Sequence, residues 1–227
     1  MKLSKDTLSV LKNFASINDG LMFRQGNVLR TCDANKQVLA ETTIPETIPG
    51  EFGIFDLNKF LSVLNLTEGD TSLQIDSPTK SLILTDVTGR SKTTYRFCDA
   101  TNIKNSPDKA INMPAPDVTF QLNQADLEFI LRAASTLGTP HIAIKSDGTK
   151  ISLSALDTKN TSTHTNQLEL GDGNGKRYSM LFKTENMKMI PGTYDVAISF
   201  KGIASFKNTS KPIQYWVATE IGSAGEA

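Results

Sequence analysis

The segment MKLSKDTLSVLKNFASI, residues 1–17, decides how the rest of the chain is interpreted. It predicts a short strand that runs into an amphipathic helix, because apolar residues recur every three positions on one face. These residues are Leu8, Leu11, Phe14 and Ile17. The opposite face carries basic and hydroxyl side chains, namely Lys5, Ser9, Lys12 and Ser16. Ser4 is expected to cap the helix, and Asp6 in its first turn favours the helix dipole.

Three later segments show the same strand–helix pattern less clearly. A strand, a helix and three strands are expected four times, with later helices capped by Asp56 and Asn123 and a short one around 184–189. The expected strands are 21–25, 28–34, 37–43, 52–55, 72–76, 81–86, 92–98, 118–122, 141–145, 150–156, 164–170, 177–183, 193–199, 201–207 and 212–219. Residues 44–50 contain two prolines and are expected to end the first set of strands, and residues 220–227 are expected to be a frayed tail.

The stretch DATNIKNSPDKAINMPAPD, residues 99–117, contains three prolines and shows no periodicity. Such a stretch is typical of an extended connector between domains. The order of elements on either side of it predicts an α+β protein of two similar domains, 1–110 and 111–227. Each domain is expected to contain two strand–helix–three-strand units.

Charge and cysteine content narrow the function classes. The chain has 24 Lys and Arg residues against 24 Asp and Glu residues, and this balance holds in both expected domains. Proteins that hold nucleic acid by phosphate neutralisation alone usually carry an excess of basic residues, so a DNA role here must rest on local charge placement or on topology.

Cys32 and Cys98 form no CxxC motif and indicate reduced, buried thiols of a cytosolic protein. No apolar run has the length of a membrane span or follows the N-terminus as a signal core, so neither a membrane role nor export is expected.

Catalytic and metal-binding motifs are not found in the sequence. His141 and His164 have no carboxylate or cysteine at ligand spacing. The stretch GDGNGKR, residues 171–177, is one residue too short for a phosphate-binding loop, and Arg177 stands where that loop needs a hydroxyl. A hairpin turn is the better interpretation. We therefore expect neither an enzyme nor a bound metal or cofactor.

Basic residues on the expected helices are the remaining functional signal. They are Lys5, Lys12, Lys59, Arg132 and Lys188. For each residue alone, an ordinary solvated helix face is the better explanation of the charge. A shared function becomes the better explanation only if all of the helices face one common partner.

Three stretches resemble the sliding clamps of T-even-type bacteriophages, the DNA polymerase processivity factors. They are MKLSKDTLSVLKNFASIN (1–18), FDLNKFLSVLNL (55–66) and NMKMIPGTYDVAISFKG (186–202). The chain length, the two-domain division and the connector also match that family. The resemblance implies the DNA-clamp fold and a homotrimeric ring with helices around the hole. It implies duplex DNA, the C-terminal peptide of the replicative polymerase, an ATP-driven clamp loader and late-transcription factors as partners, in the cytoplasm of an infected bacterium.

The resemblance also assigns roles to residues. It implies that Lys5, Lys12, Lys59, Arg132 and Lys188 face DNA phosphates in weak, non-specific contacts. It places a pocket for the polymerase peptide near the connector, with Ile111 and Met113 as apolar points and Tyr215 and Trp216 as aromatic candidates. Core packing is the alternative for both aromatic residues. Strand alternation places them on opposite faces, so at most one is expected in the inner layer. The edges that close the ring are expected at about 92–98 and 163–170.

Two other function classes are alternatives to the clamp. A β-rich structural protein of a virion, assembling through strand edges, fits the many strands but does not need basic stripes on several helices. A small-molecule enzyme has no supporting group of residues. Size in solution separates the clamp from the structural protein, because a clamp forms a discrete trimer whereas a structural protein polymerises.

Overall fold

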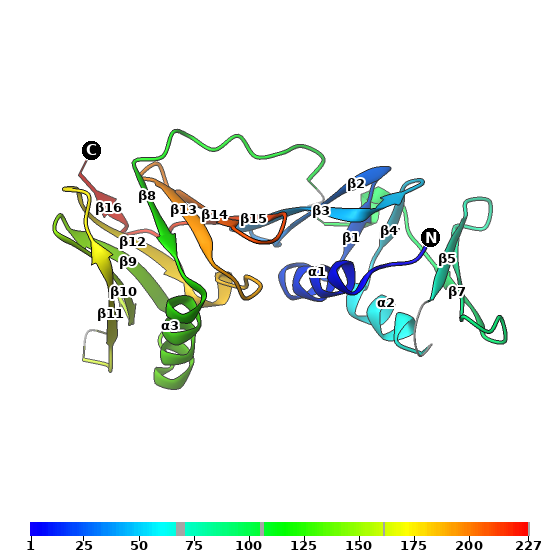
Figure 1. The fold of residues 1–227 in the computed structure, drawn as a ribbon, viewed down its shortest axis with the longest axis horizontal. Helices are drawn as coiled ribbons and strands as arrows, with labels where there is room; N and C mark the ends of the chain where they lie inside the picture. The colour runs from blue at the N-terminus through cyan, green and yellow to red at the C-terminus, as the bar shows by residue number, and fades with distance from the viewer. Residues whose placement is uncertain (67–70, 105–106, 161, 227) are drawn as a thin grey trace. The chain divides into compact units, whose positions relative to one another are not determined.

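The computed structural model describes residues 1–66, 71–104, 107–160 and 162–226, and it divides into two compact units (Figure 1). Unit 1 comprises Met1–Ala110 and unit 2 comprises Ile111–Ala227. Both units combine helices with antiparallel strands, which confirms the predicted α+β class. No helix in the described part of the chain has the length and apolarity needed to cross a membrane.

Unit 1 contains two α-helices and three groups of strands. Its elements are α1 (Lys5–Ile17), β1 (Leu21–Phe23), β2 (Gly26–Cys32), β3 (Val38–Ile48), β4 (Phe52–Ile54), α2 (Leu57–Leu64), β5 (Ser72–Asp76), β6 (Ser81–Thr85), β7 (Lys92–Arg96) and the 3-10 turn η1 (Ala100–Asn102). Strand β1 pairs with β4, β2 pairs with β3, and β5, β6 and β7 form a meander, all antiparallel. Helices α1 and α2 contact each other, and α1 also packs on β2 and β3 (Figure 1).

Unit 2 repeats the plan. Its elements are β8 (Val118–Leu122), α3 (Gln124–Leu137), β9 (His141–Asp147), β10 (Lys150–Leu156), β11 (Asn166–Asp172), β12 (Arg177–Lys183), the 3-10 turn η2 (Thr184–Asn186), β13 (Tyr194–Ser199), β14 (Ile203–Asn208), β15 (Ile213–Ala218) and β16 (Ala224–Gly225). One sheet has the order β11-β10-β9-β12-β16, and β15, β14, β13 and β8 are neighbours in that order in another. Helix α3 packs on β9, β10 and β11.

Matching hydrogen bonds show that the two units share one plan. In unit 1 the carbonyl of Asp19, just after α1, accepts from the N–H of Leu57, the first residue of α2, at 2.7 Å. In unit 2 the carbonyl of Pro140, just after α3, accepts from the N–H of Thr184, the first residue of η2, at 2.9 Å. The strands that lead into these elements also correspond, because β4 pairs with β1 and β12 pairs with β9. Turn η2 therefore takes the place in unit 2 that α2 has in unit 1.

The structure corrects the predicted start and end of the first set of strands. Met1 is not in a strand, although its amino group donates to the Leu73 carbonyl at 2.6 Å and its carbonyl accepts from the Leu73 N–H at 2.7 Å. Because α1 is capped at Ser4, too few residues precede it to form a ladder. Strand β3 continues through Pro45 to Ile48, whereas the prediction ended this strand at residue 43. The register with β2 shifts between Gly26 and Val28, so Pro45 falls in a bulge where its missing N–H costs little.

The predicted frayed tail is wrong. Strand β16 pairs with Tyr178 and Ser179 of β12, and the N–H of Glu226 donates to the carbonyl of Arg177 at 3.0 Å. Gly225 lies against the ring of Phe200, where a β-carbon would be 2.7 Å from the ring atoms. The absence of a side chain at this position therefore lets the chain end pack closely on the sheet.

Candidate nucleic-acid interface

The N-terminus of helix α1 is fixed by hydrogen-bond acceptors that are near and far in the sequence. The Oγ of Ser4 accepts from the N–H of Thr7 at 3.2 Å, as the sequence predicts for an N-cap. The carboxylate of Glu46, from β3, accepts from the N–H of Ser4 and from the hydroxyl of Thr7. The opposite face of the helix exposes Lys5 and Lys12. Strand β3 therefore determines how this pair of lysines is presented.

Replacing Glu46 by glutamine is expected to destabilise unit 1 by about 1 kcal/mol, the usual cost of losing a helix cap. Burial alone would raise the pKa of Glu46, but the hydrogen bonds from Thr7 and Ser4 lower it below its ordinary value. A lowered folded-state pKa means that this stabilisation is present above the unfolded pKa and is lost as the pH falls through the folded pKa. Urea unfolding at pH 7 and at pH 3 measures both effects. Glu51→Gln, at an exposed carboxylate, is the control and should change neither.

Helices α2 and α3 are capped as predicted and expose one basic residue each. The carboxylate of Asp56 accepts from the N–H of Lys59 at 2.8 Å, and the amide oxygen of Asn123 accepts from the N–H of Asp126 at 2.9 Å. Lys59 and Arg132 are exposed, on the side away from the buried faces of α2 and α3. Helix α3 ends at Gly138, whose φ of 65° is the left-handed conformation typical of a helix terminus.

Lys188 does not lie on a helix, which corrects the prediction for 184–189. Only the 3-10 turn η2 forms, and Lys188 follows it in an irregular segment. Met187 and Ile190 are buried at a spacing of three, which resembles a helical face. Pro191 disfavours helical backbone at Ile190, so the chain cannot continue as a helix beyond Met189. Lys188 is nevertheless exposed.

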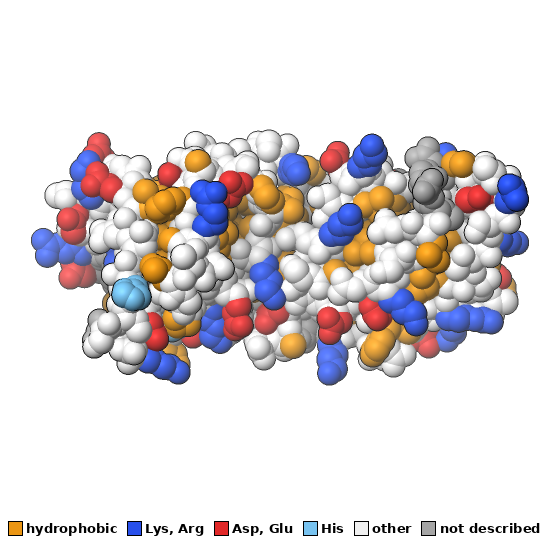
Figure 2. All heavy atoms as spheres, turned by 90° about the horizontal axis from the view of Figure 1, so that it is seen from below, with side chains coloured by type: hydrophobic (Ala, Val, Ile, Leu, Met, Phe, Trp, Pro, Cys, Tyr) orange, Lys and Arg blue, Asp and Glu red, His pale blue; other side chains and the backbone are white. Residues whose placement is uncertain are grey.

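The surroundings of the basic residues on α1, α2 and α3 suit weak phosphate contacts. Within the described ranges, no ion pair involves Lys5, Lys12, Lys59 or Arg132. On the face shown in Figure 2, basic and acidic side chains of the described residues are interspersed and form no continuous basic patch. Exposed cations without fixed partners can reach phosphates, but each helix carries only one or two of them, which limits tight binding. Nor does the described part of the chain bring three or more His, Cys, Asp or Glu residues together as metal ligands.

The four residues expected at a peptide pocket have different surroundings. Ile111 and Met113 are half-buried in the connector. Tyr215 is completely buried, its ring contacts that of Tyr194 at a centroid distance of 6.2 Å, and its hydroxyl accepts from the N–H of Ile190. Trp216 is also buried. Both aromatic residues are therefore buried. They are adjacent in β15, so strand alternation still places them on opposite faces of the sheet. Ile111 and Met113 are the accessible members of the group.

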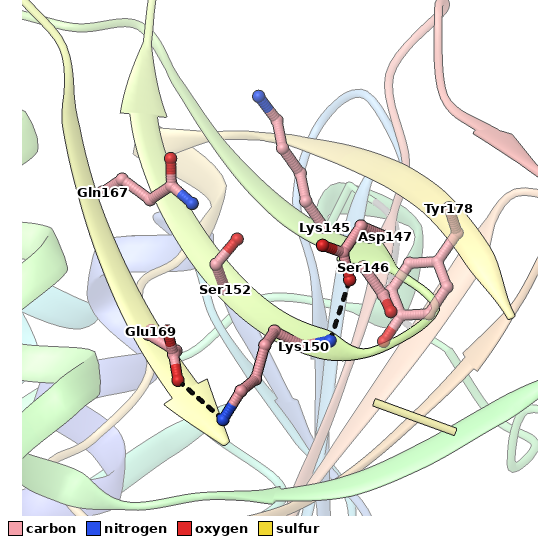
Figure 3. A pocket seen from close by; sticks show the side chains of 8 residues that line it. All are labelled: Lys145, Ser146, Asp147, Lys150, Ser152, Gln167, Glu169 and Tyr178. Carbon is pink, nitrogen blue, oxygen red and sulfur yellow. Dashed lines mark hydrogen bonds and ion pairs between the residues drawn. The ribbon is translucent and has the colours of Figure 1, made fainter. Parts of the chain in front are cut away.

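One cavity, of about 290 Å³, lies on unit 2 and is lined by polar residues of β9 to β12 (Figure 3). Lys150 donates to Glu169 at 3.0 Å and to Asp172 at 3.1 Å, so its charge is already balanced. Lys145 points away from this pair (Figure 3). None of the predicted site residues lines the cavity, and its mixed charges favour no particular ligand.

Comparison with known proteins decides the family. Residues 4–103 match the family model described as DNA polymerase processivity factor, and residues 119–221 match the model described as gp45 sliding clamp, C terminal. The chain is 33% identical to the sliding clamp of Vibrio phage KVP40, over 97% of this chain and 99% of that protein. The chain belongs to the phage sliding-clamp family. It is 32% identical to the sliding clamp of Enterobacteria phage T4, over 98% of each chain.

The solved structures support the same fold. PCNA from Thermococcus kodakaraensis superposes with a TM-score of 0.71 at 16% identity, covering 97% of this chain and 99% of that one. The DNA-clamp fold and the function of a sliding clamp, a DNA polymerase processivity factor, are therefore confirmed. The alternative of a virion structural protein is not supported by any of these similarities.

Proposed function

We propose that three copies of this clamp close head to tail into a ring that encircles duplex DNA and tethers the replicative polymerase. Two open sheet edges support the closure. In the described residues β7 pairs only with β6, and β11 pairs only with β10, so each strand leaves one edge unpaired within its own unit. Because these edges belong to different units, joining them between copies is a heterologous contact that can close a ring.

The charges on the two edges are complementary, and this observation carries the proposal. Strand β7 exposes Lys92 and Arg96, whereas β11 exposes Glu169 and Asp172, two acids that share the single cation Lys150 and so leave this edge acidic. Unpaired edges are usually blunted against association, and opposite charges instead favour one specific partner edge. The number of copies comes from the family resemblance, which implies six domains around the ring.

In this proposal the helices line the hole and the clamp has no catalysis of its own. Lys5, Lys12, Lys59, Arg132 and Lys188 make weak phosphate contacts, while topology rather than affinity keeps the ring on DNA. A neutral chain is consistent with this, since tight contacts would hinder sliding. An ATP-driven loader opens the ring. The phage relatives support a place of action in the cytoplasm of an infected bacterium, where late-transcription factors are a further class of partner.

Retention on circular DNA tests the ring directly. The clamp, loaded by its loader with ATP, is expected to stay on a nicked circular plasmid during gel filtration and to be lost when the plasmid is cut once. A protein bound only by its charges would leave both forms of DNA at the same rate. Equal loss from circular and linear DNA would therefore contradict encirclement.

The polymerase peptide is expected to bind beside the connector. Ile111→Asp and Met113→Asp should each weaken binding at least tenfold, because a charge in an apolar contact costs more than about 1.4 kcal/mol. The fluorescence of Trp216, the single tryptophan, provides the measurement during titration with the polymerase C-terminal peptide. Asn112→Asp, at an exposed position between them, is the matched control. Unchanged affinity in both variants, with an intact trimer, would remove the connector from the pocket.

A further inference from the structure

The segment from Met187 to Gly192 is irregular but firmly packed. Met187 and Ile190 are 4% and 6% exposed, and Lys188 between them is exposed. Gly192 lies so close to the side-chain amide of Asn208 that a β-carbon would not fit. In unit 1 the basic residue Lys59 lies within α2, the counterpart of η2, and is held by the hydrogen-bond ladder of that helix. Unit 2 has no such ladder beyond η2 and must hold Lys188 in another way.

Two tyrosine hydroxyls contact both backbone polar groups of one residue in this segment. The N–H of Ile190 donates to the hydroxyl of Tyr215 at 3.2 Å, and the hydroxyl of Tyr194 donates to the carbonyl of Ile190. Tyr194 is in β13 and Tyr215 in β15, and both are completely buried. Burial raises the pKa of both phenols, that of Tyr194 to about 12, so both hydroxyls keep their protons at neutral pH.

We propose that the hydroxyls of Tyr194 and Tyr215 hold the backbone of Ile190 and so position Lys188 toward DNA, in place of the helix that unit 2 lacks. The inference rests on the proposed function, in which Lys188 faces a phosphate. It gives Tyr215 a positioning role through Lys188 rather than a direct contact with a partner peptide. A buried N–H and carbonyl that both have partners are fixed far more firmly than groups bonded to water.

The first measurement is hydrogen exchange at the Ile190 amide in the intact clamp. Tyr215→Phe keeps the ring and removes only the hydroxyl, so exchange should become about five to ten times faster, as expected for one net hydrogen bond. Tyr194→Phe is the second variant and should also accelerate it. Tyr178→Phe is the matched control, because Tyr178 is buried in the same unit and its hydroxyl has no partner in the described residues. Unchanged exchange at Ile190 in both test variants would overturn the proposal.

The second measurement is the salt dependence of clamp binding to duplex DNA. Lys188→Ala should flatten the slope by about 0.9 for each phosphate that is no longer neutralised. Tyr215→Phe should flatten it partly, and the double variant should match Lys188→Ala, because the tyrosine acts through the lysine. A slope that Tyr215→Phe leaves unchanged, while Lys188→Ala alters it, would overturn only the positioning role. A slope that Lys188→Ala leaves unchanged would overturn this inference and the assignment of Lys188 to DNA.

Discussion

Replacing Lys92 and Arg96 by glutamate is expected to convert the proposed trimer into monomers at micromolar concentration. The two substitutions place acidic groups on β7 opposite Glu169 and Asp172 of β11 in the neighbouring copy. Like charges brought together at an interface cost several kcal/mol, so the dissociation constant should rise at least 100-fold. Light scattering or sedimentation measures the mass directly. Because exposed charges are screened, the parent trimer should also dissociate more readily at high salt.

Controls separate the disruption of the sheet edge from general effects of charge. Lys36→Glu with Lys109→Glu makes the same change at two exposed lysines of unit 1 outside β7 and should leave the trimer intact. Arg96 also donates to the Thr79 carbonyl within unit 1, so Lys92→Glu alone shows whether that hydrogen bond matters.

A variant with the charges of both edges reversed is expected to restore the trimer. Changing Glu169 and Asp172 to lysine in the K92E/R96E chain restores opposite charges at every interface. Lys150 must become glutamate in the same chain, because it pairs with both of these acids. This five-fold variant is expected to form trimers again. A K92E/R96E chain that remains trimeric would place the subunit contact elsewhere.

The sequence predicted the helices well where their signals were local. Ser4, Asp56 and Asn123 each cap a helix with a side chain that lies three residues before the N–H it accepts. Such caps combine with apolar periodicity in one short window, so they can be recognised without knowing the tertiary structure. The three helices with this combination formed with the predicted start, and all four of their predicted basic residues are exposed.

Most of the failures involve partners that lie far away in the sequence. The helix expected near 184–189 has the right apolar spacing, but Pro191 limits its extension. Just beyond it, the backbone of Ile190 is bonded to the hydroxyls of Tyr194, four residues on, and of Tyr215 in β15, instead of to an i→i−4 ladder. The strand in the supposed tail depends on Phe200 and β12. Glu46 supports the start of α1 from a strand about forty residues away, and no local pattern marks it for that role. These contacts arise only when the sheets assemble, so periodicity and propensity give no sign of them.

The five basic residues Lys5, Lys12, Lys59, Arg132 and Lys188, changed together to alanine, should sharply reduce loading on DNA while the trimer stays intact. Each phosphate that is no longer neutralised should flatten the salt dependence of DNA association by about 0.9, so the slope should fall by several units if all five contribute. The affected side chains are exposed, and exposed substitutions usually change the free energy of unfolding by less than about 0.5 kcal/mol. Thermal unfolding and light scattering verify both conditions.

Loading of the clamp on DNA and its retention there, measured separately, test whether the five basic residues face DNA. Alanine at five exposed lysines outside the helices, Lys36, Lys109, Lys159, Lys201 and Lys207, removes equal charge and is the matched control. Only the variant at Lys5, Lys12, Lys59, Arg132 and Lys188 should show a flatter salt dependence of loading. Once loaded on a circular plasmid, however, it should remain bound as long as the parent, because a threaded ring needs no phosphate contact to stay on a closed circle. Loading and processive synthesis equal to the parent at every salt concentration would show that these residues do not face DNA.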